Sequence, residues 1–306
     1  MTRALVTGVG GQDGGYLAEA LLDDGVEVHS LGLGHDVVPA GVVGHVGDLA
    51  DVDATRALVR DLSPDVVYNL AAISSVALSW EQPDLVARVN GTAAVALLES
   101  ARLVGARVVQ ASSAEIFGEP ATSPQDESTP VRPLNPYGAA KAYAHLAVEV
   151  YRRRGLHASS MVLYNHESPR RPKQFVTRKI TSTVAAIARG EADRLVLGNL
   201  DARRDWGWAP DYVAALRLAA AADQPDDYVI ATGVARSVRD FVGTAFARAG
   251  VSGWERLVEV DEAFVRPADA TELVGDASRA RARLGWAPTI GFEEVVGRMV
   301  DADLHG

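Results

Sequence analysis

The sequence predicts a doubly wound α/β fold, in which a parallel sheet carries helices on both faces. Short runs of Val, Leu and Ile alternate with amphipathic helical segments through the first half of the chain, and a glycine-rich turn follows the first run. Strands that are apolar throughout are typical of parallel sheets covered on both sides. Beyond about Asn165 the alternation breaks into segments rich in Pro and Arg. We therefore expect a large domain at residues 1–165, joined by a segment near 205–235, and a smaller, discontinuous α/β lobe within 166–306.

The expected elements follow one another in chain order. Each expected strand is a run of apolar or β-branched residues, and each expected helix spaces its apolar residues by three or four positions. Strands are expected at 3–6, 27–33, 43–46, 65–70, 107–112, 157–164 and 228–232. Helices are expected at 15–24, 53–61, 84–104, 136–154 and 214–222. The strand at 228–232 is expected to rejoin the large sheet.

Composition and charge narrow the classes of protein. The 306 residues are 48% hydrophobic and 23% charged, which is typical of a globular protein with a sizeable core. The net charge of -10 argues against binding to nucleic acid or an anionic membrane, although local Arg clusters can still bind a phosphorylated ligand. There is no Cys, so disulfides and thiolate zinc sites are excluded, and we predict no metal site. No apolar run reaches the ~18 residues of a membrane span, and the N-terminus lacks a signal-peptide layout, so we expect a cytoplasmic protein.

A glycine-rich turn follows the first strand and opens a helix. Gly8, Gly11 and Gly14 form G-x-x-G-x-x-G, which lets the backbone approach a pyrophosphate at a helix N-terminus. An ordinary tight turn is the alternative, but the motif stands first in a β-α-β series, as a Rossmann-type domain requires. We therefore predict a bound NAD or NADP. The end of the second strand does not decide between them, because Asp36 is as consistent with a solvated loop as with a ribose contact.

A second group of residues suits oxidation of an alcohol. Tyr137 and Lys141 form a Y-x-x-x-K pair, which places both side chains on one face of a helix. Ser113 and Glu115 follow a predicted strand, at the end where parallel sheets bind ligands. These residues supply a base, a cation that lowers the pKa of the base, a hydroxyl and a carboxylate. Such a set suits removal of a hydride from an alcohol and further acid–base chemistry on the ketone that forms. A core Tyr with a snorkelling Lys, and a solvated Glu115, are the structural alternatives.

Beyond these residues, the chain resembles the extended short-chain dehydrogenase/reductases and, among them, the GDP-mannose 4,6-dehydratase family. The resemblance covers nearly the whole chain and depends on several motifs. They are GQDGGYLAE at 11–19, NLAA at 69–72, SAEIFG at 113–118, NHESPRR at 165–171, FVTRKI at 175–180, LGNLDARRDWG at 197–207 and DDYVIATG at 226–233. The implied activity is dehydration of a nucleotide sugar, with a GDP-sugar favoured and the cofactor recycled internally.

The resemblance also implies roles for the matching residues. Tyr137, made more acidic by Lys141, would take the proton of the carbon-4 hydroxyl while Ser113 hydrogen-bonds its oxygen. Glu115 would take the carbon-5 hydrogen, water would leave carbon 6 and the stored hydride would return there. The implied cofactor contacts are Gly8, Gly11, Gln12, Asp13, Gly14, Asp48, Leu49, Leu70, Ala71, Tyr137 and Lys141. The implied nucleotide-sugar contacts are Asn165, Val176, Lys179, Arg204 and Arg266, with structural ion pairs as the alternative for the two arginines. Asp48 is equally consistent with a helix N-cap.

The chain departs from the family's pattern in two regions. Leu33-Gly34 replaces a pair of arginines that precedes a long loop, so neither NADP preference nor tetramer formation follows from the resemblance. Ile73, Ser75 and Trp208 stand where the family commonly has Gln, His and His, which favours a changed hexose or a changed outcome.

Two alternative functions and one question of assembly stay open on the sequence alone. A 4-epimerase or a decarboxylase of the same superfamily is the first alternative, and a non-catalytic NAD(P)-binding regulator is the second. The apolar faces of the helices at 84–104 and 136–154 predict a homodimer, although the same faces are consistent with packing on the sheet only.

Overall fold

The computed structural model describes residues 2–34, 37–261 and 272–306. Seven strands form one parallel sheet in the order β10-β6-β5-β4-β1-β2-β3. Their bounds are Arg3–Thr7 (β1), Glu27–Gly32 (β2), Val43–Val46 (β3), Val66–Asn69 (β4), Arg107–Ala111 (β5), Ala158–Leu163 (β6) and Asp227–Ile230 (β10). The predicted doubly wound sheet is confirmed, and β10 joins it at one edge beside β6.

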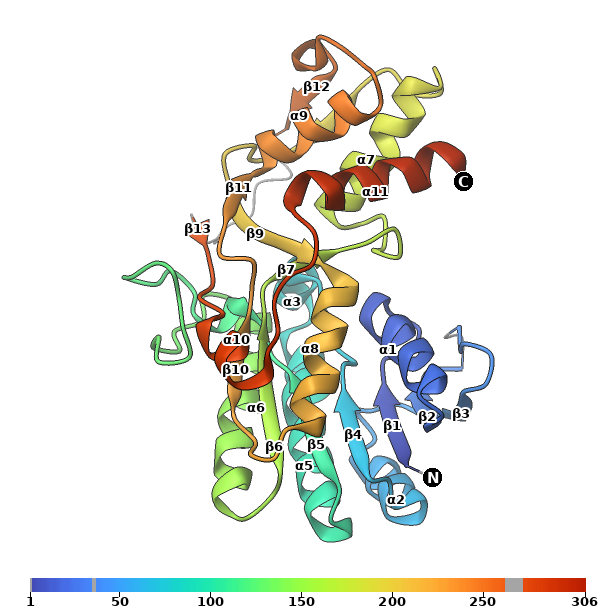
Figure 1. The fold of residues 1–306 in the computed structure, drawn as a ribbon, viewed down its shortest axis with the longest axis vertical. Coiled ribbons are helices and arrows are strands. Elements are labelled where there is room, and N and C mark those ends of the chain that lie inside the picture. Colours follow the sequence, from blue (N-terminus) through green and yellow to red (C-terminus); the bar gives the residue numbers. More distant parts are fainter. Residues whose placement is uncertain (1, 35–36, 262–271) are drawn as a thin grey trace.

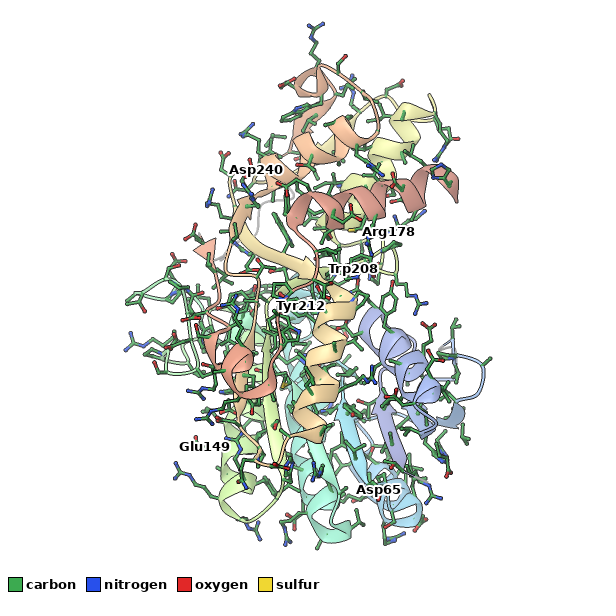
Figure 2. All side chains as sticks on the ribbon, in the orientation of Figure 1. Asp65, Glu149, Arg178, Trp208, Tyr212 and Asp240 are labelled. Atoms are coloured by element: carbon green, nitrogen blue, oxygen red, sulfur yellow. The ribbon has the colours of Figure 1, made fainter. Side chains whose placement is uncertain are left out.

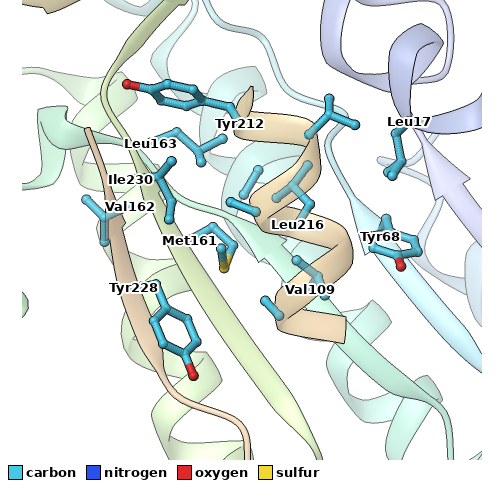
Figure 3. Close-up of a cluster of buried hydrophobic side chains, with 14 of the residues drawn as sticks. Leu17, Tyr68, Val109, Met161, Val162, Leu163, Tyr212, Leu216, Tyr228 and Ile230 are labelled. Carbon is cyan, nitrogen blue, oxygen red and sulfur yellow. The ribbon is translucent and has the colours of Figure 1, made fainter. Parts of the chain in front are cut away.

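Helices cover both faces of this sheet (Figure 1). One face carries α1 (Gln12–Asp23) and α8 (Ala209–Ala221), and the other carries α2 (Val52–Leu62), α5 (Ala93–Val104) and α6 (Pro136–Arg153). Side chains alternate between two apolar clusters, because successive residues of a strand point to opposite faces. On β1, Val6 packs in the cluster under α1 and α8, where Figure 3 shows Met161 and Leu216, whereas Leu5 packs in the cluster under α2 and α5.

The long helix expected at 84–104 is divided. Helices α3 (Val76–Glu81) and α4 (Pro83–Val86) precede a π-helical turn, η1 (Ala87–Thr92), which leads into α5. Asn90 in this turn accepts from the Ile73 N–H at 2.8 Å and donates to its carbonyl oxygen at 3.0 Å. The π-helical turn therefore holds the loop that follows β4 by side-chain contacts, and such turns are frequent near functional sites.

A smaller lobe sits above the carboxyl ends of the strands. Its strands are β7 (Asn165–Glu167), β9 (Arg203–Trp208), β11 (Ala235–Ser237) and β13 (Glu272–Leu273), with β8 (Leu195–Leu197) paired to β12 (Val258–Val260). Its helices are α7 (Val176–Ala188), α9 (Val238–Arg248), the short η3 (Trp254–Arg256) and α11 (Phe292–His305). Figure 2 places Trp208 and Tyr212 near the junction of the lobes and Glu149 near the opposite end of the large sheet.

The large lobe also recruits a late segment. Helix α10 (Ser278–Leu284) packs against β10, and the buried Trp286 donates its indole N–H to the Asp211 carbonyl oxygen at 2.7 Å. Residues near 280–286 therefore share the core of the large lobe, in addition to the expected segment near 205–235. The division into domains at 1–165 and 166–306 stays a prediction. None of the described helices combines the length and apolar character needed to cross a membrane.

Candidate active site

The glycine-rich turn is tightly packed where it enters α1. Gly11 donates its N–H to the Gly8 carbonyl oxygen at 3.0 Å, and Gly8 has a left-handed φ of 75°. A Cβ on Gly14 would lie 2.1 Å from the Gly8 oxygen, so a side chain cannot fit there. Helix α1 begins at Gln12 without a side-chain cap, which leaves its first backbone amides for a ligand. A glycine turn that ends in open helical amides fits a diphosphate.

We expect Gly14→Ala to destabilise the protein by about 3 kcal/mol and to abolish cofactor binding, because the turn must open to admit the methyl group. Gly15→Ala is the matched control, since its Cβ would lie 3.3 Å from the flexible end of the Arg170 side chain and 3.7 Å, an ordinary contact distance, from the Val9 carbonyl oxygen. Thermal unfolding and calorimetric titration with NAD and NADP measure both effects. Equal behaviour of the two variants would contradict this account of the turn.

Two polar residues of the turn bind within the protein. Asp13 Oδ2 lies 2.8 Å from His166 Nε2, and Gln12 Nε2 donates to the His166 carbonyl oxygen at 3.1 Å. Burial raises the pKa of Asp13, but His166, Arg171 and Gln12 together lower it, so the net pKa is below the ordinary value. For His166, burial lowers the pKa whereas the Asp13 carboxylate raises it, and the net pKa is above the ordinary value. The two side chains therefore form an ion pair. This pair ties the turn to β7, across the junction of the lobes.

A buried hydrogen-bond chain joins three neighbouring strands beside the turn. Thr7 donates from Oγ1 to Asn69 Oδ1 at 2.7 Å, and Asn69 donates from Nδ2 to Gln110 Oε1 at 2.7 Å. The N–H groups of Leu70 and Ala71 both donate to Thr7 Oγ1 at 3.1 Å. The structure therefore brings the predicted cofactor contacts Leu70 and Ala71 against the glycine turn.

Besides the glycine turn and the segment at Leu70 and Ala71, the predicted cofactor contacts include Asp48 and Leu49, which lie between β3 and α2. Asp48 and His45 line a cavity of about 360 Å³ there. The N-cap of α2 is Asp51, whose side chain accepts from the Ala54 N–H at 3.0 Å. The alternative that Asp48 caps this helix is therefore wrong. Leu49 is buried in the cluster under α2 and α5.

The four residues predicted to be catalytic converge at the carboxyl end of β5. Tyr137 and Lys141 occupy the first turns of α6, and Lys141 donates from Nζ to the Ala111 carbonyl oxygen at 2.9 Å. The Tyr137 hydroxyl is hydrogen-bonded to the Ser113 side chain, which also accepts from the Glu115 N–H at 3.3 Å. The carboxylate, the hydroxyl and the phenol thus lie together at one site.

Burial dominates the electrostatics of the pair on α6. It raises the pKa of Tyr137 to about 12, against a smaller opposite effect of the Ser113 hydrogen bond. It also lowers the pKa of Lys141 to about 8, although Asp13 acts in the other direction. The pKa of the phenol is thus raised overall, because removing the phenolate from water costs more than nearby charges return. That Lys141 makes the phenol more acidic stays a prediction.

The buried ammonium of Lys141 predicts a pH-dependent cost to stability. Up to about pH 8 this group is charged in the folded and unfolded states, so its full desolvation cost is present. Between about 8 and 10.5 the folded state releases the proton first, and the cost falls by about 3 kcal/mol. Lys141→Met should therefore be more stable than the wild type near pH 7, and the difference should shrink towards pH 10.5. Urea unfolding at both pH values tests this, and a pH-independent difference would contradict it.

The predicted nucleotide-sugar contacts lie above this site. Asn165 on β7 pairs with Trp206 on β9, the strand that carries the buried Arg204. Val176 and Lys179 occupy the first turns of α7, which Thr177 ties to β7 by a 2.6 Å hydrogen bond to Glu167. Arg266, like Asp36, lies outside the described residues.

The family model and the similar proteins all indicate one family for this chain. The family model for GDP-mannose 4,6 dehydratase matches residues 5–299. GDP-mannose 4,6 dehydratase 1 of Arabidopsis thaliana is 44% identical, over 99% of this chain and 90% of the relative, and the Homo sapiens GDP-mannose 4,6 dehydratase is 39% identical, over 99% and 91%. The chain belongs to the GDP-mannose 4,6-dehydratase family.

Solved structures extend this family assignment to the fold. The UDP-glucose 4-epimerase of Thermus thermophilus, in complex with NAD, superposes with a TM-score of 0.87, 30% identity and 99% coverage of both chains. The UDP-glucose 4-epimerase of Thermotoga maritima superposes with a TM-score of 0.89 over 98% of both chains, at 24% identity. This chain therefore shares the large parallel sheet and the upper lobe with both of these solved structures.

The three residues that the sequence analysis set apart from the dehydratase family's pattern each have structural partners. Ser75 caps α3, with its Oγ accepting from the Leu78 N–H at 3.2 Å. Trp208 ends β9, and the Arg298 guanidinium lies 5.3 Å from its ring centroid. The Ile73 backbone is held by Asn90, as described above.

Two polar residues near the dehydratase site received no role from the sequence. His166 pairs with Asp13, and Asn135 donates from Nδ2 to Glu115 Oε2 at 2.8 Å. A signal for Asn135 was present, because Asn directly before Pro at a helix start is typical of an N-cap. The partner of His166 lies 153 positions away in the chain, which local patterns cannot indicate.

Proposed function

We propose that this chain is a nucleotide-sugar 4,6-dehydratase that converts GDP-mannose to GDP-4-keto-6-deoxymannose with bound NADP or NAD. Family membership supports the reaction, and the position of Glu115 beside Ser113 and Tyr137 carries the proposal. A simple 4-epimerase needs the Tyr and Lys pair but no carboxylate at this position. A site that combines the Tyr and Lys pair with a carboxylate is suited to eliminating water.

A dinucleotide fits the residues of the proposed cofactor site. Gly8 and Gly14 leave no room for a Cβ, and the amides of α1 begin without a side-chain cap. The proposed contacts are the backbone of the turn, Asp48, Leu49, Leu70 and Ala71, with Tyr137 and Lys141 at the reactive end. The bound oxidised cofactor supplies a hydride acceptor and a positive charge that favours the phenolate.

Tyr137 and Ser113 carry the proposed first proton transfer. The Ser113 hydroxyl holds the carbon-4 oxygen, and Tyr137 accepts the proton from it. Because burial raises the pKa of Tyr137 to about 12, the pKa must fall in the ligand-bound site for the phenol to act as a base near neutral pH. Lys141 contributes positive charge from the same face of α6.

Glu115 carries the proposed later steps. A ketone at carbon 4 makes the carbon-5 hydrogen acidic, and the Glu115 carboxylate removes it. The hydroxyl at carbon 6 then leaves as water, which leaves a double bond between carbons 5 and 6. The hydride removed from carbon 4 would return to carbon 6, and carbon 5 would take up a proton from solvent, which gives the 4-keto-6-deoxy sugar. Since Ala114 offers no second acid, Glu115 returns its proton to the leaving hydroxyl, so one carboxylate acts first as base and then as acid.

The nucleotide end of the substrate is assigned to the upper lobe. We propose that Asn165, Val176, Lys179 and Arg204 contact the GDP-sugar, whereas the predicted contact Arg266 lies outside the described residues. A guanidinium can hydrogen-bond two oxygens of a diphosphate at once, which suits Arg204 to this role. A cytoplasmic location stays a prediction.

Incubation with GDP-mannose deuterated at carbon 4 tests the proposed function. Transfer of the label to carbon 6 of a 4-keto-6-deoxy product is expected. A label retained at carbon 4 of an inverted sugar would instead establish the epimerase hypothesis. A parallel panel of GDP-, UDP-, CDP- and dTDP-sugars checks the base and the hexose, and tight cofactor binding without turnover of any sugar would indicate the regulator.

We also propose a homodimer formed through α5 and α6. Tyr143, Leu146 and Val150 lie on one face of α6 with 54%, 50% and 57% of their surface exposed, and Leu103 on α5 is 70% exposed. This spacing forms an apolar stripe of the kind that a second copy would cover.

Leu146→Glu is expected to convert the dimer to monomers, because it places two charges in a self-complementary interface. Val260→Glu is the control, since Val260 is similarly exposed at 57% but lies on β12 in the upper lobe. Sedimentation velocity distinguishes the two assemblies. A wild-type monomer, or a Leu146→Glu dimer, would contradict the proposed interface.

A further inference from the structure

Asn135 bonds two parts of the proposed catalytic site at once. It is the last residue before α6, and only 6% of its surface is exposed. Its side-chain oxygen accepts from the Gly138 N–H at 2.7 Å, which caps the helix that carries Tyr137. Its side-chain nitrogen donates to Glu115 Oε2 at 2.8 Å.

Capping alone does not require an amide at this position. Ser, Thr and Asp cap helices about as well as Asn, but none of them adds an N–H donor of this reach. A Cβ on Gly138 would lie only 2.6 Å from the Glu115 carbonyl oxygen, so the start of α6 packs directly on the Glu115 backbone. In this close packing the two ends of one Asn side chain reach the helix amide and the carboxylate.

We propose that Asn135 is a positioning residue that fixes the Glu115 carboxylate relative to the start of α6, and therefore relative to Tyr137. The inference rests on the proposed dehydratase function, in which Glu115 acts at carbon 5. With Oε2 held, Oε1 has no hydrogen-bond partner among the described residues and is the oxygen left for the proton transfer.

Two variants separate positioning from capping. Asn135→Ser keeps the cap and removes the donor, so kcat for dehydration should fall roughly 10- to 100-fold, with KM and thermal unfolding close to the wild type. Asn135→Asp keeps the cap and places a second carboxylate beside Glu115. The two carboxylates then compete for one proton, so the base limb of the pH–rate profile should move to higher pH. Carbon-4 oxidation, followed in the first turnover by the absorbance of reduced nicotinamide, should be unchanged in Asn135→Ser.

The matched control is Asp51→Ser, which makes a cap exchange at the start of α2 and should leave kcat and the pH profile unchanged. Wild-type kcat and pH profile in Asn135→Ser would overturn the inference while leaving the dehydratase function intact. Equal losses of oxidation and dehydration would also overturn it, because they indicate a disturbed helix rather than a displaced carboxylate. A wild-type protein that forms no deoxy product would overturn the proposed function and this role together.

Discussion

Replacing Glu115 by Gln is expected to reduce formation of the 4-keto-6-deoxy product by about 1,000-fold and to leave oxidation at carbon 4 intact. Gln keeps an oxygen that can accept from Asn135, so the site should retain its shape. It cannot take a proton from carbon 5 or return one to the leaving hydroxyl. Reduced nicotinamide should therefore accumulate in the first turnover without a deoxy sugar.

Chromatography of the sugar products and uptake of solvent deuterium at carbon 5 measure the effect of Glu115→Gln. Glu149→Gln is the control, because Glu149 lies on α6 at the opposite end of the large sheet, where it pairs with Arg153 (Figure 2). Full dehydration by Glu115→Gln would remove this carboxylate from the mechanism. Loss of carbon-4 oxidation as well would assign Glu115 to the first step instead.

Tyr137→Phe is expected to stop the reaction one step earlier, with a loss of about 1,000-fold or more in carbon-4 oxidation itself. The phenyl ring fills the same space but lacks the hydroxyl that is hydrogen-bonded to Ser113. Since carbon 5 becomes acidic only after the ketone forms, solvent exchange at that carbon should disappear too. Glu115→Gln and Tyr137→Phe therefore differ in whether reduced nicotinamide appears.

The control for Tyr137→Phe is Tyr151→Phe, at the other end of the same helix. Stopped-flow absorbance of reduced nicotinamide measures the first step, and mass spectrometry of the sugar measures exchange at carbon 5. Rapid reduction of the cofactor by Tyr137→Phe would show that another group accepts the carbon-4 proton.

Most of the large lobe could be predicted because its signals are local. Apolar runs define the strands, and the order of turn, strand and helix defines a parallel sheet. The same patterns overestimated the helix at 84–104, which is divided by a π-helical turn. Apolar periodicity does not distinguish these helix types, and the turn is accompanied by the contact of Asn90 with Ile73, 17 positions away.

In the candidate site, too, contacts within one element could be predicted from the sequence, whereas contacts between elements could not. The Tyr137–Lys141 pair lies within one helix, so its spacing alone placed both side chains on one face. The pairing of Asn135 with Glu115 and that of Asp13 with His166 join separate elements, and no local pattern indicates them. The upper lobe was least predictable, because its short strands pair across long stretches of chain.

The sequence by itself determined the doubly wound fold, the glycine turn, and the presence of Ser113, Glu115, Tyr137 and Lys141 at the ends of predicted elements. Only the tertiary structure decided how these four groups interact and how far burial shifts the pKa values of Tyr137 and Lys141. Burial raises the pKa of Tyr137 to about 12 and lowers that of Lys141 to about 8, and the spacing of the pair indicates neither shift. The physical reason is that the cost of removing a charge from water depends on every element packed around it, whereas a motif specifies only the residues within it.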